Sequence, residues 1–140
     1  METIIGLGSA GCNIADQFAK YSQYEIYKLD VGISGKNCYY LPEYDTPEEY
    51  EANMGDLTNV FSGVGGDILF VVGGSGNVSG GLLRALEQLK HCNINVLYVQ
   101  PNLSLLGERK RQQERLVYYV LQEYARSGLF KMLYLVSNPS

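Results

Sequence analysis

Residues 4–13 have the sequence Ile-Ile-Gly-Leu-Gly-Ser-Ala-Gly-Cys-Asn (IIGLGSAGCN), and this stretch decides the fold. Thr3–Leu7 is short, apolar and rich in β-branched side chains, which predicts a buried strand. Ala10–Tyr21 predicts a helix, because its apolar residues recur at helical spacing: Ile14, Ala15, Phe18 and Ala19. Three glycines lie where the two patterns meet, so the chain is expected to turn sharply from strand to helix there.

Strand and helix patterns alternate along the rest of the chain. Further strands are predicted at Glu25–Asp30, Asn37–Leu41, Asp67–Val72, Asn95–Val99 and Lys131–Val136, and the third and last of these are apolar enough to be buried. Helices are predicted from a Thr46 cap to about Val60, over Leu82–His91 and over Leu106–Ser127. Such alternation is typical of βαβ units. Residues 1–140 are therefore expected to form one three-layer α/β domain, a mostly parallel sheet with helices on both faces.

The composition limits the kinds of function. A net charge of −4 supplies no basic field for nucleic acid or for a membrane surface, so neither is expected as a partner. Three cysteines without CxxC spacing predict neither a disulfide framework nor a structural zinc site. There is no signal-peptide pattern, and no apolar run approaches the roughly 18 residues of a membrane span. A cytoplasmic location is expected.

Chemistry-bearing residues gather at one predicted edge of the sheet. In an open parallel sheet, ligands bind beyond the carboxyl ends of the strands, where loops lead into helix N-termini. Gly6–Asn13, Asp30 and Gly73–Ser79 all follow predicted strands. Glycines let a backbone approach phosphate oxygens closely, and the amides at a helix start supply donors and a positive dipole. The two glycine-rich loops are therefore candidates for phosphate binding.

The first loop on its own fits a dinucleotide-binding hypothesis. Gly6-x-Gly8-x-x-Gly11 matches the GxGxxG fingerprint of NAD-binding Rossmann domains. Asp30 follows at about the 20-residue distance expected of an acid that binds the ribose. This hypothesis leaves the second glycine-rich stretch, residues 73–81 (GGSGNVSGG), without a role.

Both loops are accounted for by a resemblance to the tubulin and FtsZ family. Residues 8–16 (GSAGCNIAD) resemble the first phosphate loop of that family, and residues 70–83 (FVVGGSGNVSGGLL) resemble its GGGTG[ST]G signature loop. Residues 96–111 (VLYVQPNLSLLGERKR) and 130–140 (FKMLYLVSNPS) resemble later FtsZ segments in the same order. The resemblance covers essentially the whole chain and only the N-terminal nucleotide-binding domain of the family. The family's central helix and C-terminal domain have no counterpart here.

The resemblance implies binding of GTP or GDP, with Mg as a candidate companion ion, linked to self-assembly or filament formation. Partners would be other copies of the chain or a related tubulin-like subunit. Asp30 would face the ribose or the metal. The implied nucleotide-binding residues are Gly6, Gly8, Ser9, Ala10, Gly11, Cys12, Asn13, Asp30, Gly73, Gly74, Ser75, Gly76, Asn77 and Lys110. No catalytic residue and no set of metal ligands is expected within the chain, because hydrolysis in the family needs an acid from a neighbouring subunit.

Departures from the family keep a second hypothesis open. Val78 stands at the last glycine of the signature loop, and Leu106 stands where FtsZ has a ribose-contacting glutamate. The segment 41–51 (LPEYDTPEEYE), which corresponds to a third and glycine-rich phosphate loop, is acidic and would repel a phosphate. The chain is thus also consistent with a structural or assembly protein that keeps the fold without the nucleotide. His91, the single histidine, is expected at a helix C-terminus in a structural role.

Overall fold

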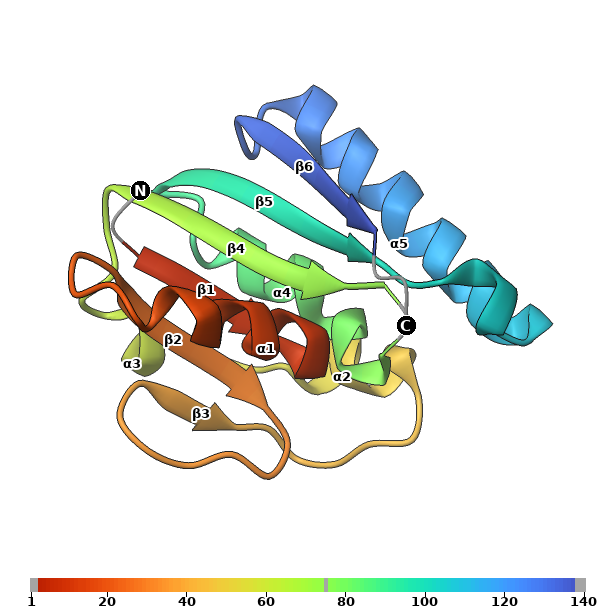
Figure 1. The fold of residues 1–140 in the computed structure, drawn as a ribbon, viewed down its shortest axis with the longest axis horizontal. Helices are drawn as coiled ribbons and strands as arrows, with labels where there is room; N and C mark the ends of the chain where they lie inside the picture. The colour runs from red at the N-terminus through yellow and green to blue at the C-terminus, as the bar shows by residue number, and fades with distance from the viewer. Residues whose placement is uncertain (1–2, 75, 138–140) are drawn as a thin grey trace.

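The computed structural model describes residues 3–74 and 76–137 and contains one six-stranded, all-parallel sheet (Figure 1). The strand order is β3-β2-β1-β4-β5-β6. The strands span Thr3–Leu7 (β1), Glu25–Asp30 (β2), Cys38–Tyr40 (β3), Asp67–Gly73 (β4), Asn93–Gln100 (β5) and Met132–Ser137 (β6). This is the α/β, Rossmann-like arrangement that the alternating sequence pattern predicts.

The centre of the sheet is the pair of strands β1 and β4. All five residues of β1 are buried, and so are Ile68–Val72 of β4. The two strands pair in parallel from Thr3 opposite Ile68 to Leu7 opposite Val72. A parallel strand with helices over both faces has no solvated side, which is why both sequences are continuous apolar runs instead of alternating ones.

Helices lie on both faces of the sheet (Figure 1). The helix α1 (Gly8–Phe18) packs through Ala15 against one face, over Ile4, Leu69 and Val71. The opposite face carries the larger core cluster, which includes residues of α2 (Pro47–Asn53), α3 (Thr58–Phe61), α4 (Leu82–Glu87) and α5 (Glu108–Ser127). Two short 3₁₀ segments, η1 (Asn77–Gly81) and η2 (Leu103–Leu105), precede α4 and α5.

The helix predicted from Thr46 to about Val60 is two helices. Its start is confirmed: the Thr46 hydroxyl oxygen accepts a 3.2 Å hydrogen bond from the backbone N–H of Glu49. The chain breaks after Asn53 because Gly55 takes a left-handed conformation, with φ of 73°. The side chain of Gln88 fixes this break, since it donates to the Gly55 carbonyl at 2.9 Å and accepts from the Leu57 N–H at 2.6 Å. The helix α4, which follows later in the chain, ends at Glu87, before the predicted His91.

The last strand, predicted as buried, is an exposed edge strand, and this prediction was wrong. Among the described residues β6 pairs only with β5, and Met132 and Leu135 are about half exposed, at 51% and 52%. Tyr134 and Val136 are also exposed, whereas Leu133 packs against the larger core cluster. The apolar sequence alone did not reveal that β6 lies at the end of the strand order.

None of the helices in residues 3–74 and 76–137 combines the length and the apolar character needed to cross a bilayer.

The close approach of α1 to the sheet gives a test of the fold. A Cβ at Gly11 would overlap the carbonyl oxygen of Val71 in β4, and backbone atoms of a central strand cannot move aside cheaply. We expect Gly11→Ala to lower the free energy of unfolding by about 2–3 kcal/mol in urea denaturation. Gly63→Ala is the matched control, because a Cβ there meets nothing within 4 Å. Equal stability of the two variants would contradict the tight packing of α1.

Candidate functional site

A cavity of about 480 Å³ opens at the carboxyl ends of β1, β2 and β4. It lies at the edge of a parallel sheet where ligands of α/β proteins bind. Both glycine-rich loops, the end of β2 and the acidic segment before α2 contribute to its wall. Its lining residues are Leu7, Gly8, Ser9, Ala10, Asn13, Asp30, Val31, Glu43, Tyr44, Tyr50, Gly73, Gly76, Asn77, Val78 and Ser79.

The first loop brings the N-terminus of α1 to the cavity. Gly8 has φ of +76°, a conformation that glycine adopts without strain, and the helix begins at this residue. No side chain caps the helix, and its first turn holds no acidic residue. The first backbone N–H groups of a helix have no partner within the helix, so Ser9 and Ala10 present donors at the positive end of its dipole.

Three predicted site residues lie behind the cavity wall and do not line it. A Cβ at Gly6 would come within 2.6 Å of the Gly11 carbonyl oxygen, and Gly11 in turn packs against β4. The buried thiol of Cys12 donates to the carbonyl oxygens of Gly6, at 3.5 Å, and of Leu29, at 3.7 Å. Burial, followed by the nearby charge of Asp30, raises the pKa of Cys12 to about 12. These residues shape the turn between β1 and α1.

The second loop is tied to its surroundings by side chains. The Ser79 hydroxyl donates to the Gly73 carbonyl and closes the loop on itself. Asn77 donates to the Asp45 carbonyl at 3.0 Å and accepts from the Lys110 ammonium at 3.2 Å. Lys110 therefore lies beside the loop without lining the cavity. Ser75, a predicted site residue, lies outside the described residues.

The Tyr98 ring backs the second loop. A Cβ at Gly74 would overlap the Tyr98 hydroxyl, so only glycine fits at this position. That hydroxyl donates to the carboxylate of the buried Glu114 at 3.0 Å, and Gln100 donates to the same oxygen at 3.4 Å. Burial, together with the Glu114 charge, raises the pKa of Tyr98. Gly74 thus packs against a polar network from β5 and α5 and does not line the cavity.

The two loops approach each other at Val78. This residue is 8% exposed, and its Cβ lies 3.8 Å from the position that a Cβ at Gly8 would take. The valine side chain therefore occupies space between the two loops. An apolar side chain supplies no hydrogen bond to a phosphate, so any phosphate here must be held by the neighbouring amides.

The cavity is acidic. Asp30 and Glu43 both line it, and no Lys or Arg is among the described residues that do so. One Asp30 carboxylate oxygen accepts the Val31 N–H at 2.8 Å, which leaves the other oxygen without a hydrogen bond in the described part of the chain. Among the described residues, no group of three or more His, Cys, Asp or Glu side chains is placed to hold a metal ion. A negatively charged ligand would therefore need the helix N-terminus, or a cation bound with it.

Two tyrosines in the wall were not predicted. The rings of Tyr44 and Tyr50 meet edge to face with centroids 5.0 Å apart. The Tyr50 hydroxyl accepts from the Tyr44 N–H at 3.0 Å and donates to the Pro42 carbonyl at 2.9 Å. The sequence around these tyrosines is acidic and so indicates a charged segment. The only sequence signal for its structure is the helix start at Thr46.

No protein-family model matches the chain, and no curated protein sequence matches it.

The buried thiol beside the first loop gives a pH test. Below about pH 9 the Cys12 thiol is neutral in both states, whereas between about pH 9 and 12 it ionises only in the unfolded chain. The free energy of unfolding should therefore fall as the pH rises above about 9, by up to about 1.4 kcal/mol per pH unit for this thiol. Denaturation curves of wild type and Cys12→Ala between about pH 8 and 10.5 isolate the contribution of Cys12 to this pH dependence. Equal slopes for the two proteins would contradict a buried neutral thiol.

Proposed function

We propose that the chain binds a guanine nucleotide, GTP or GDP, in this cavity, and that binding is linked to self-assembly. One observation carries the proposal: two glycine-rich loops from separate strands, and Asp30 from a third, line the same cavity of about 480 Å³. A volume of this size suits a small ligand. The preference for guanine rests on the resemblance of residues 8–16 and 70–83 to tubulin and FtsZ.

The phosphates would bind between the two loops. Ser9 and Ala10 at the start of α1 would donate backbone N–H groups, as helix N-termini do for many phosphates. Asn13 and Asn77 line the cavity with side-chain amides, and Lys110 adds a positive charge beside Asn77. These donors offset the apolar Val78.

The acidic wall suits the other parts of the ligand. Asp30 can accept hydrogen bonds from ribose hydroxyls, as acids after the second strand of such sheets do. A Mg²⁺ ion bound with the phosphates would favour the carboxylates of Asp30 and Glu43, since this ion prefers oxygen ligands and keeps several waters. The partly buried Tyr44 ring, which packs against the buried Tyr50, offers an apolar surface for the base. The proposal is one of binding: hydrolysis would need an acid from a neighbouring subunit.

Two alternative functions remain, and each is favoured by particular residues. Val78 and the two wall carboxylates favour a structural protein that keeps the fold without nucleotide. The Gly6-x-Gly8-x-x-Gly11 pattern favours an NAD-binding domain, in which Gly11 packs the helix on the sheet as the third glycine of the fingerprint does. An NAD site needs no second loop, and the second loop lining the same cavity supports the guanine-nucleotide proposal instead.

Self-assembly is supported by the edge strand β6. Its residues from Met132 to Ser137 are uncharged, and four of its apolar side chains are exposed. An unpaired, uncharged strand edge is a template for pairing with another chain, and most proteins protect such edges with charges or proline. A second copy of the chain, or a related subunit, is the partner proposed. The three unpaired cysteines support a reducing, cytoplasmic setting for this assembly.

A glycine pair tests the nucleotide site. Gly76 and Gly107 are both helix N-cap residues with negative φ, and a Cβ at either meets nothing within 4 Å, so alanine is tolerated structurally at both. Only Gly76 lines the cavity. In calorimetric titrations with GTP or GDP in magnesium, we expect Gly76→Ala to weaken binding by about tenfold, or about 1.4 kcal/mol. Gly107→Ala should bind like wild type.

The same titrations decide between the alternatives. GTP or GDP binding that Gly76→Ala leaves unchanged would contradict the two-loop site. Binding of NAD without GTP or GDP would support the dinucleotide hypothesis, with ATP as the control for a general affinity for adenine. A folded chain that binds none of the four would support the structural hypothesis.

A charge on β6 tests assembly. Leu135 on β6 and Leu105 on η2 are both exposed, at 52% and 69%. We expect Leu135→Lys to reduce the association of the chain measured by sedimentation velocity, because a charge at an open strand edge opposes pairing. Leu105→Lys makes the same change of charge away from the edge and should leave association unchanged. If both variants lose association, the change in net charge, and not the strand edge at β6, would account for the effect.

A further inference from the structure

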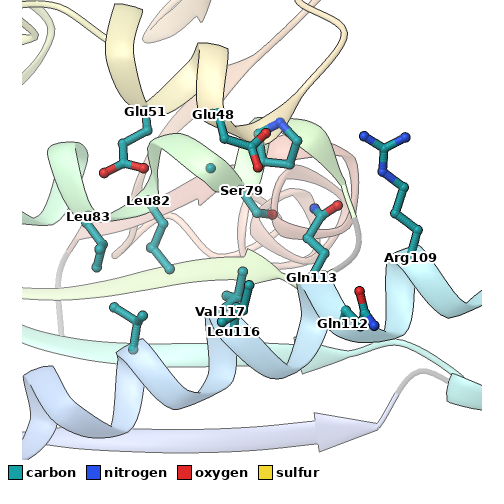
Figure 2. Close-up of a pocket in the computed structure, with 13 residues that line it drawn as sticks. Glu48, Glu51, Ser79, Leu82, Leu83, Arg109, Gln112, Gln113, Leu116 and Val117 are labelled. Atoms are coloured by element: carbon teal, nitrogen blue, oxygen red, sulfur yellow. The ribbon is translucent and has the colours of Figure 1, made fainter.

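A second cavity, a groove of about 350 Å³, lies between α2 and α5 (Figure 2). It is separate from the proposed nucleotide site, and Ser79 is the one residue that lines both. The hydroxyl of Ser79 is bound to the Gly73 carbonyl and takes no further part here. The groove is lined by Pro47, Glu48, Glu51, Ser79, Gly80, Leu82, Leu83, Arg109, Gln112, Gln113, Leu116, Val117 and Val120.

The floor of the groove is apolar. Leu82 and Leu83 from α4 face Leu116 and Val117 from α5 across it (Figure 2). Leu116 is 65% exposed, so its side chain is accessible to a ligand. An apolar floor of this kind gains free energy when a ligand displaces water from it.

The charges of the groove are separated. Glu48 and Glu51 are three residues apart on α2 and so share one face of that helix. Arg109 lies at the opposite end of the groove from Glu51 (Figure 2). These three are the only charged side chains of the lining, and none forms an ion pair within the described part of the chain. The groove is therefore negative beside α2 and positive at its far end. Leu82 and Leu83 lie on the Glu51 side, whereas the polar side chains of Ser79 and Gln113 lie toward Arg109 (Figure 2).

We propose that this groove binds a small organic amine with an apolar body. The ammonium group would lie between Glu48 and Glu51, the body would cover Leu83 and Leu116, and Arg109 would direct the charged end away from itself. The occupant is a small molecule because a volume of about 350 Å³ lies at the lower end of the range for small-molecule pockets. The proposal does not depend on the nucleotide, since no charged residue of the groove lines the other cavity.

Three probes with one apolar body and different end groups test it: 4-phenylbutylamine, 4-phenylbutan-1-ol and 4-phenylbutanoate. Each is titrated into the nucleotide-free full chain, and backbone amide shifts are followed by NMR. We expect the amine to bind with a dissociation constant of about 1 mM and to shift the amides around Leu83 and Leu116. The alcohol should bind about fivefold more weakly and the carboxylate about tenfold or more. Of the three probes, only the amine should bind more weakly when salt is added.

Variants on the helix α2 distinguish binding at the groove from a general effect of removing one negative charge. Glu48→Gln and Glu51→Gln should each weaken amine binding by about two- to fivefold. Glu49→Gln is the control: it lies on the same helix, makes the same charge change, does not line the groove and can keep the cap with Thr46. Arg109→Gln should bind the amine as well as wild type or better.

Four outcomes would overturn the proposal. They are the absence of shifts around the groove, equal affinity for the amine and the carboxylate, an effect of Glu49→Gln as large as that of Glu51→Gln, and a loss of affinity in Arg109→Gln. Because no nucleotide is present, failure here and failure of nucleotide binding are told apart by separate titrations.

Discussion

The close contact between α1 and the central strands is the constraint on which the rest of the structure depends. Gly6 and Gly11 have no side chains, so the backbone of the helix lies directly on β1 and β4. At Gly73 a Cβ would come within 2.9 Å of the Ala10 Cβ, so the end of β4 approaches the first turn of α1 in the same way. The glycines thus bring the helix N-terminus and the second loop to one place. Without that contact there would be two loops and no shared cavity.

The second loop depends on parts of the chain that come much later. α5 donates to it twice, from Lys110 to the Asn77 side chain and from Gln113 to the Gly76 carbonyl at 3.0 Å. Glu114 of the same helix, 2% exposed, holds the Tyr98 hydroxyl against Gly74. Charged groups are costly to bury unless they are hydrogen-bonded, so this carboxylate fixes the helix relative to β5. The groove between α2 and α5 is a result of that fixed position.

Much of the fold could be predicted from local patterns. The buried strands β1 and β4 were predicted from their continuous apolar runs, and the start of α2 from Thr46–Pro47. These signals depend only on residues close in sequence. The break at Gly55 needs Gln88, and the exposure of β6 needs the strand order, so neither is visible in a local window. In the site, the glycine loops and Asp30 were recognisable by composition. Tyr44 and Tyr50 were not, because they enter the wall only when α2 folds over the sheet edge.

The strand order also has a kinetic consequence. β1 lies between β2 and β4, and the first residues of the chain pair with a strand that begins at Asp67. Forming that central pair closes a long loop, and the entropy of closure is lost before the buried contacts compensate it. α1 and the other helices can form within microseconds, whereas parallel pairing between distant segments is slow. β1 therefore waits for the segment that begins at Asp67 before both of its edges are paired.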